Sequence, residues 1–495
     1  MEILATLPVL LTSALYAVTT APAAGGDPGA PTASMAPVSG SEGRGQTDGD
    51  DPVLRALAPV PGGLTANGVA QAAVDAGPTV DEANAQLEAA RAQLDEVRKS
   101  FTPALSLEAS AARLSKVQAG IPLDDMTMAL VGDEFSFDIP LNQYALTARL
   151  GLPVSDWILQ LLPGLKAGEA GSRGAELRRD AERRVVATDA RIAFYGWLRA
   201  KAQVAVAEAS LARSQARLRD AQAGVRAGMM SPGDELRVDA LVARTEAALE
   251  AARAAERVSR RALAILTALP LESNFEVGEA VMGTSAAEAT EDLDTLVSRG
   301  LARRPELLAV DAALDEVEAS TRARRAAYFP RVSAFGEATY ANPNQRFFPL
   351  SDEWNGSWAV GASLVWSLEA AVVATARVDA LKASRVRVDA QREQLRRAVT
   401  LEVVQAFEAV ARTEASLVAN ERAKTSAAEA YRVVSVRFAN GTATTTDVIN
   451  AEFDRVDASL ALVNTHLDLL EARARLDFAT GAPVLAAGVD GDEPG

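Results

Sequence analysis

The same change from a helical to a strand pattern occurs twice in this chain, and it constrains the fold more than any other feature. Residues 304–329 follow a helical pattern, which Pro330 stops because proline lacks an N–H and disfavours helical geometry at the preceding residue. Residues 331–340 then alternate as in a strand. A similar helix, proline and strand occur earlier in the chain, at Pro103. The pattern predicts an internally duplicated chain.

Each copy is predicted to continue with a second strand, a long helix, a turn and a shorter helix. The second strands are expected at Gln143–Pro153 and Ser357–Leu368, the long helices at Leu165–Arg226 and Ala370–Phe438, and the shorter helices at Asp234–Leu269 and Thr446–Phe478. The turns align at a smaller offset than the prolines do, because the loop between the strands is shorter in the second copy (341–356 against 113–142). The last helix carries apolar residues at the 4-3 spacing of a coiled-coil seam: Ile449, Phe453, Val456, Leu460, Val463, Leu467, Leu470 and Ala474.

The N-terminal residues resemble a secretory signal. The apolar run Leu7–Val18 precedes Ala21-Pro22-Ala23, a plausible cleavage site, so residues 1–23 are predicted to be a signal peptide. Glu2 and the lack of Lys or Arg before the run depart from the usual pattern, and a membrane anchor is the competing interpretation. Residues 24–63 are rich in Gly, Pro, Ser and Asp and are expected to be a disordered leader.

The remaining chain divides into four expected parts. These are a first structural repeat at 64–269, a linker at 270–300, a second repeat at 301–481 and a C-terminal tail at 482–495. The expected fold is mainly α with membrane β-strands.

Composition excludes several functional classes. The net charge is −16 and no basic face stands out in the sequence, which argues against nucleic acid as a partner. No cysteine is present, and His466 is the single histidine, so thiolate and imidazole chemistry are disfavoured. We expect no enzyme activity, no cofactor and no metal site, and we expect His466 to flank the seam or be exposed. No other stretch reaches 18 apolar residues, so no transmembrane helix is predicted.

The four strands suit a membrane better than a soluble cap. A membrane-spanning β-strand contains about 9–11 residues, and the predicted strands have this length. Aromatic residues cluster near their ends, as in membrane β-barrels. Four strands are too few to close a barrel, whereas three chains would supply twelve. The alternative is a soluble coiled-coil structural protein with a small β cap, for which the sequence offers no second apolar layer.

From Leu64 to Pro483 the chain resembles the TolC-like outer-membrane efflux proteins. The motifs that carry the resemblance are Arg304-Pro305-Glu306-Leu307, Ala-Ala-Tyr-Phe-Pro at 326–330, Gly-x-x-Thr-x-x-Asp at 441–447 with its diverged partner at 228–234, and the segment 472–481 that closes the last helix. The resemblance implies a homotrimer with a shared twelve-stranded β-barrel in the outer membrane of a Gram-negative-type bacterium and a long α-helical barrel in the periplasm. It implies the exit duct of a tripartite efflux pump or type I secretion system, with a periplasmic adaptor and an inner-membrane pump as partners.

The resemblance also implies roles for particular residues. Asp447 matches an aspartate that, in the family, belongs to a carboxylate ring lining the periplasmic entrance. Asn450 lies where some relatives have a second acidic residue. Asp234 matches an aspartate that forms a salt bridge between the helix tips in the family, but its basic partner is replaced here by Ala443. From the residues themselves, segments 231–234 and 444–447 are both predicted to be capping boxes, with Ser231 or Thr444 at the N-cap and an aspartate three residues later. The expected adaptor contacts are Gly228, Met229, Met230, Ser231, Gly441, Thr442 and Thr444. The helix-to-strand junctions at Phe101, Pro103, Tyr328, Phe329 and Pro330 are expected to lie at the membrane interface, against outer-membrane lipid.

Overall fold

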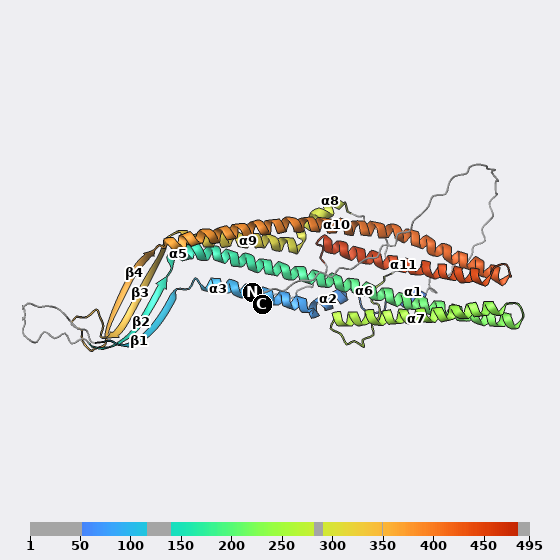
Figure 1. Ribbon diagram of the computed structural model, residues 1–495, viewed down its shortest axis with the longest axis horizontal. Helices are drawn as coiled ribbons and strands as arrows, with labels where there is room; N and C mark the ends of the chain where they lie inside the picture. Colours follow the sequence, from blue (N-terminus) through green and yellow to red (C-terminus); the bar gives the residue numbers. More distant parts are fainter. Residues whose placement is uncertain (1–51, 116–139, 282–290, 349, 484–495) are drawn as a thin grey trace, which may run out of the picture. The chain divides into compact units, whose positions relative to one another are not determined.

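The structure is a computed structural model that describes residues 52–115, 140–281, 291–348 and 350–483. The expected signal peptide, most of the expected leader and loop 113–142, and all but the first two residues of the expected tail lie outside the described residues. The described residues form a mainly helical fold with one four-stranded antiparallel sheet (Figure 1).

The elements follow the predicted duplication. The first copy contains α2 (Ala66–Ala76), α3 (Pro78–Lys99), β1 (Ala104–Arg113), β2 (Asn142–Leu152), α5 (Val154–Asp156), a π-helical turn (Trp157–Leu161), α6 (Leu162–Arg226) and α7 (Pro232–Leu266). The second contains α8 (Leu293–Arg303), α9 (Pro305–Arg325), a 3-10 turn (Ala326–Tyr328), β3 (Arg331–Asn342), β4 (Asn355–Val365), α10 (Leu368–Ala439) and α11 (Thr445–Ala479). The prediction that a strand extends to Leu368 is wrong, because Ser367 caps α10 by accepting a hydrogen bond from Ala370 N at 3.2 Å.

Part of the expected disordered leader is ordered. Residues 52–63 include α1 (Pro52–Ala56), and Val53 and Leu57 are buried in the core beside α6. The chain then pairs with the expected linker: Val60 N donates to Val277 O at 2.7 Å, and Leu64 N donates to Glu276 O at 2.8 Å. The prediction is wrong for this part because the polar composition hid two apolar residues at helical spacing.

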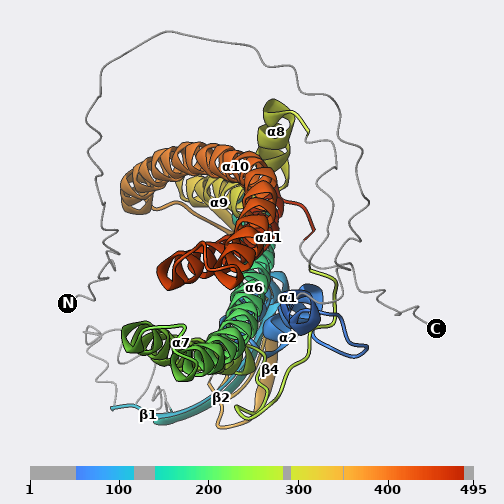
Figure 2. The ribbon, with the colours of Figure 1, turned by 90° about the vertical axis from the view of Figure 1, so that its right-hand side faces the viewer.

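The largest core cluster lies where α6 meets α7 and α11. Phe194, Trp197 and Leu198 of α6 are fully buried with Leu263 of α7 and Leu467 of α11. α11 lies between α6 and α10 and contacts both (Figure 2). It therefore has a second buried stripe, which the single predicted seam missed.

The second stripe of α11 contains Leu462, Leu469 and Ala472, packed against Val410 and Leu417 of α10. Of the predicted seam, Val463, Leu467 and Ala474 are buried, whereas Phe453 is 44% exposed. A helix held between two neighbours needs two apolar stripes, and the sequence period of one stripe does not reveal the other.

The sheet has two chemically different faces. Its strand order is β1-β2-β3-β4, so β1 and β4 each keep one unpaired edge. In the observed register, one face is apolar or glycine except for Arg113, Asn142 and Asn342, at the end of the sheet farthest from the helices. Its apolar and glycine residues are Leu105, Leu107, Ala109, Ala111, Tyr144, Leu146, Ala148, Leu150, Leu152, Val332, Ala334, Gly336, Ala338, Tyr340, Gly356, Trp358, Val360, Ala362 and Leu364. We call this set the apolar face. The opposite, polar face carries Glu108, Thr147, Arg149, Glu337 and Ser363 among others.

The shorter helix that closes each repeat, α7 in the first and α11 in the second, ends in the same type of turn. The two turns differ in the residue that has positive φ. Thr267 and Thr480, at equivalent positions of the two copies, each donate a hydroxyl hydrogen bond of 2.8 Å to the carbonyl four residues earlier. The next residue has positive φ in both copies, 53° at Ala268 and 74° at Gly481. Alanine is strained there, because its Cβ crowds the neighbouring carbonyl.

Ala268→Gly is expected to stabilise the protein by about 0.5–1 kcal/mol, the relief of left-handed strain less the entropy that glycine loses on folding. The midpoint of thermal unfolding in detergent measures it. The reciprocal change Gly481→Ala should destabilise, since a Cβ there would lie 2.8 Å from Arg303 Cβ. A lower midpoint for Ala268→Gly would contradict the strain argument.

Candidate functional site

The turn between α6 and α7 forms one helix tip. Gly228 has φ +71°, its N–H donates to Val225 O at 3.0 Å, and Met229 N donates to Gly224 O at 2.8 Å. These two bonds make a Schellman motif, which needs a left-handed residue at this position and so accounts for Gly228. Met229 is 79% exposed, whereas the side chain of Met230 folds back over Gly224. Of the two methionines expected at the surface, only Met229 is exposed.

The turn between α10 and α11 repeats this geometry in the second copy. Gly441 has φ +74°, its N–H donates to Phe438 O, and Thr442 N donates to Arg437 O, both at 2.9 Å. Gly441 and Thr442 are exposed. The two tips therefore share a backbone but differ in side chains, with an exposed thioether at the first and an exposed hydroxyl at the second.

Both predicted N-caps are present. Ser231 Oγ accepts from Asp234 N at 3.2 Å and donates to Asp234 Oδ2 at 2.7 Å. Thr444 forms a full capping box: its Oγ1 accepts from Asp447 N at 3.2 Å, while its own N–H donates to Asp447 Oδ2 at 2.8 Å. The predicted N-caps are therefore confirmed at both helix starts, whereas the predicted capping box is complete at Thr444 and not at Ser231.

The two tip aspartates differ in their partners. Asp234 Oδ1 lies 3.3 Å from Arg237 Nη1, within its own helix. Asp447 is exposed, and hydrogen bonds from the Thr444 N–H and hydroxyl lower its pKa below the ordinary value. It therefore stays ionised at neutral and mildly acidic pH. Asn450, one turn further along α11, is also exposed and carries no charge.

The helix-to-strand junctions lie at the end of the sheet that joins the helices. Phe101 and Tyr328 are partly buried, whereas Phe329 is 54% exposed, and Pro103 and Pro330 immediately precede β1 and β3. Ser155 Oγ accepts from Val332 N at 2.9 Å, which ties the first copy to the start of β3. The two junctions thus occupy one level of the fold.

Most of the apolar face is exposed, although Ala148, Leu152, Ala334 and Gly336 on it are half-buried. Leu107 is 79% exposed, Val360 77% and Trp358 75%. Among the described residues, the strands pack against one another and, at the base of β3, against α5, and no helix covers the apolar face. Among the described helices, none combines the length and the apolar composition that crossing a bilayer requires.

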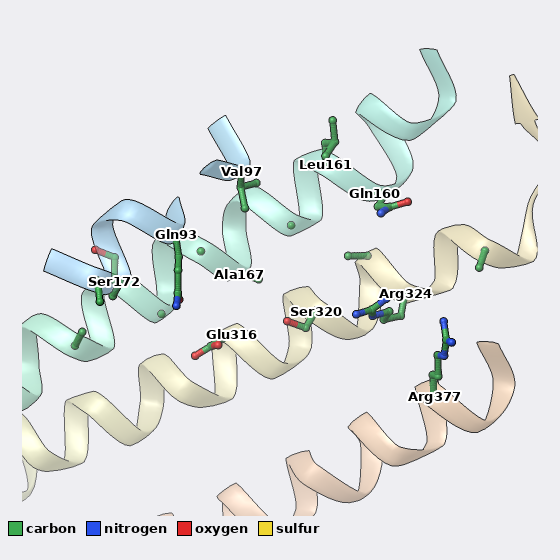
Figure 3. Close-up of a pocket in the computed structure, with 18 of the residues that line it drawn as sticks. Gln93, Val97, Gln160, Leu161, Ala167, Ser172, Glu316, Ser320, Arg324 and Arg377 are labelled. Carbon is green, nitrogen blue, oxygen red and sulfur yellow. The ribbon is translucent and has the colours of Figure 1, made fainter. Parts of the chain in front are cut away.

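A polar groove that the sequence did not reveal follows one face of α6. Its first pocket, about 710 Å³, lies between α3, α6 and α9 and reaches Arg377 on α10 (Figure 3). Two further pockets continue the groove along α6. The second shares Arg178 with the first, and the third shares Val185 with the second. We call the pocket nearest the sheet the junction pocket. Sequence periodicity could not indicate this groove, since its walls come from five helices of both copies: α3, α6, α9, α10 and α11.

Comparison with known proteins agrees with this architecture. Residues 69–268 and 296–482 match the outer membrane efflux protein (OEP) family, one segment in each copy. The outer-membrane channel OprN is 22% identical with a TM-score of 0.70, covering 85% of this chain and 90% of that one. The MtrE outer membrane channel of Neisseria gonorrhoeae, in an open state, is 19% identical with a TM-score of 0.67, covering 85% and 89%.

The CmeC outer membrane channel of Campylobacter jejuni is 15% identical with a TM-score of 0.69, covering 85% of this chain and 88% of that one. No sequence match to a curated protein is found. The fold, a four-stranded sheet with one apolar face joined to long paired helices, is the fold of outer-membrane channels with a helical barrel. The chain belongs to the outer membrane efflux protein family.

Proposed function

We propose that this protein works as a homotrimeric exit duct in a tripartite efflux pump or a type I secretion system. The observation that carries the proposal is the sheet: one exposed face that is apolar over most of its length, one polar face and two unpaired edges. Three copies joined edge to edge would close a twelve-stranded barrel with lipid outside and a polar lumen inside. Catalysis has no part in this role.

The proposed setting is the outer membrane of a Gram-negative-type bacterium, with the helices in the periplasm. α6 and α10 contain 65 and 72 residues, and at about 1.5 Å per residue each extends roughly 100 Å from the sheet. The tips would then lie far from the outer membrane, where an adaptor linked to an inner-membrane pump can reach them. The exposed Met229 and the Gly228 and Gly441 turns are the proposed adaptor contacts.

Extraction tests the duct directly. The protein should fractionate with outer membranes, need detergent for release and run as a heat-modifiable trimer in gel electrophoresis. Full solubility without detergent would instead support the coiled-coil protein with a β cap.

We further propose that Asp447 forms the carboxylate ring of the periplasmic mouth. Three ionised carboxylates around one axis attract multivalent cations, which then block the channel. Asp447→Asn is expected to raise the half-blocking concentration of hexaamminecobalt(III) about tenfold in single-channel recordings, because the charge is removed while an amide oxygen can still accept from Thr444 N. The block in the unmodified protein should persist on acidification until the pH approaches the lowered pKa of Asp447.

Asp454→Asn is the matched control, because Asp454 is also exposed on α11 but lies two turns from the tip. It should leave the block within about twofold of the unmodified protein, since salt screens exposed charges beyond about 10 Å. Unchanged block by Asp447→Asn would remove Asp447 from the gate.

A further inference from the structure

The junction pocket carries a strong excess of positive charge in a chain whose net charge is −16. Arg178, Arg324, Arg331 and Arg377 line it, and Glu316 is the single carboxylate among its described lining residues. Arg331 Nε lies 3.9 Å from Asp156, but Arg178, Arg324 and Arg377 form no ion pair with a carboxylate in the part of the chain that the structure describes. Guanidinium groups without a fixed carboxylate partner are available to an incoming anion.

Local helix stability does not account for this cluster. Arg324 lies in the last turn of α9, where the helix dipole favours a cation. Arg377 lies inside α10, beyond the first turn, where the dipole gives no reason for one. The two side chains project from neighbouring helices into the same pocket (Figure 3), so tertiary packing brings the charges together.

The pocket also supplies neutral hydrogen-bond donors and open space. Gln93 and Gln160 line it with Ser172 and Ser320. Gly168 and Gly171 of α6 also line it, and a Cβ on them would lie 3.1 Å from Leu94 Cδ1 and 3.5 Å from Glu316 Cδ, so glycine keeps this space open. Amide and hydroxyl groups beside several guanidinium groups are the usual chemistry for binding phosphate or carboxylate oxygens.

Charge changes sign along the groove. The pocket farthest from the sheet is lined by Asp189, Glu402, Asp468 and Glu471 against Arg412 and Arg475. Arg331 belongs to the polar face of β3, so the junction pocket opens on the side of the sheet opposite the apolar face. On the proposed function, that side is the lumen.

We propose that the junction pocket is an anion-binding site of the duct, which takes solutes bearing phosphate or carboxylate groups, with one copy per protomer around the lumen. This inference rests on the proposed function, because only a closed trimer places the pockets on a conducting path. The site would hold anionic solutes where the helical barrel meets the β-barrel, beyond the acidic region nearer the tips.

Single-channel recording tests the site, with pyrophosphate as the probe. Full-length trimers in phosphatidylcholine bilayers should be blocked by pyrophosphate. The double variant Arg324→Gln with Arg377→Gln should raise the half-blocking concentration at least about tenfold. It should also shift the reversal potential in a KCl gradient toward cation selectivity. Arg377→Gln alone, on an exposed part of α10, should give an intermediate shift and serves if the double variant fails to assemble.

The matched control is Arg325→Gln with Arg385→Gln, which removes the same charge from α9 and α10 at exposed residues outside the pocket. It should change the half-blocking concentration less than about twofold. Equal loss of block in both double variants, or no block of the unmodified channel, would overturn the proposal. Block that disappears when the bilayer contains phosphatidylglycerol would show that a lipid headgroup fills the pocket and would also overturn it.

The failure of the duct itself would look different. If the unmodified protein forms no conducting channels in any bilayer, the proposed function is wrong. Conducting channels that ignore pyrophosphate would leave the duct intact and remove only the anion site.

Discussion

Val360→Arg is expected to lower the free energy of unfolding by about 2–4 kcal/mol per protomer, the cost of a cation on the lipid-facing side of a barrel near the bilayer centre. Val360 is the middle residue of β4 (Asn355–Val365), it pairs with Gly336 on β3, and it is 77% exposed on the apolar face. Three such arginines in one trimer would add their costs. Most of the heat-modifiable trimer should therefore be lost from the outer membrane.

The neighbouring residue gives a matched control. Ala359 lies on the polar face and pairs with Glu337, so Ala359→Arg places the same side chain on the other side of the same strand, opposite a carboxylate. Its free energy of unfolding in lipid vesicles, followed by urea denaturation, should stay within about 1 kcal/mol of the unmodified protein. Equal losses in the two variants would mean that the apolar face does not contact lipid.

Arg304→Met is expected to cost about 3 kcal/mol of folding stability, at the lower end of the range for breaking a buried ion pair. The Arg304 side chain is 6% exposed, and its guanidinium contacts Glu306 at 3.0 Å and Glu402 of α10 at 3.0 Å. It also stacks over the Phe478 ring of α11, 4.4 Å from the centroid, and donates to Phe478 O at 3.4 Å. One side chain thus joins α9, α10 and α11.

The lower end of the range applies because the two carboxylates are less buried, at 23% and 41% exposed, and water can replace the lost arginine. Thermal unfolding in detergent measures the loss. Arg303→Met is the control, since Arg303 is exposed and its change should cost less than about 0.5 kcal/mol. A small effect of Arg304→Met would show that the three helices are held by apolar packing alone.

Sequence reasoning recovered the elements that depend on local chemistry. The helix stops before Pro103 and Pro330 and the two capped starts at Ser231 and Thr444 follow from the residues themselves, and the structure contains all of them. The tip glycines were also predictable, because a helix-to-helix turn needs a left-handed residue. The roles of Asp447, Asn450 and the adaptor-contact residues remain proposals.

Most of the errors arose where distant parts of the chain meet. The polar composition of residues 24–63 hid the packing of Val53 and Leu57 against α6. A strand was predicted to reach Leu368, but Ser367 caps α10 instead. A single apolar seam was predicted on α11, but the helix has two buried stripes. A contact with another element decided the first and the last of these outcomes, whereas the Ser367 cap is a local hydrogen bond to the first turn of α10.

The duplication, the four amphipathic strands and the long helices could be predicted from the residues alone, because periodicity and proline act on neighbouring residues. The tertiary fold set the strand register that puts the apolar residues of all four strands on one face of the sheet. It also decided the burial of Arg304 and the meeting of Arg178, Arg324, Arg331 and Arg377 in one pocket. These features depend on side chains far apart in the chain, whose proximity is fixed by how whole helices and strands pack.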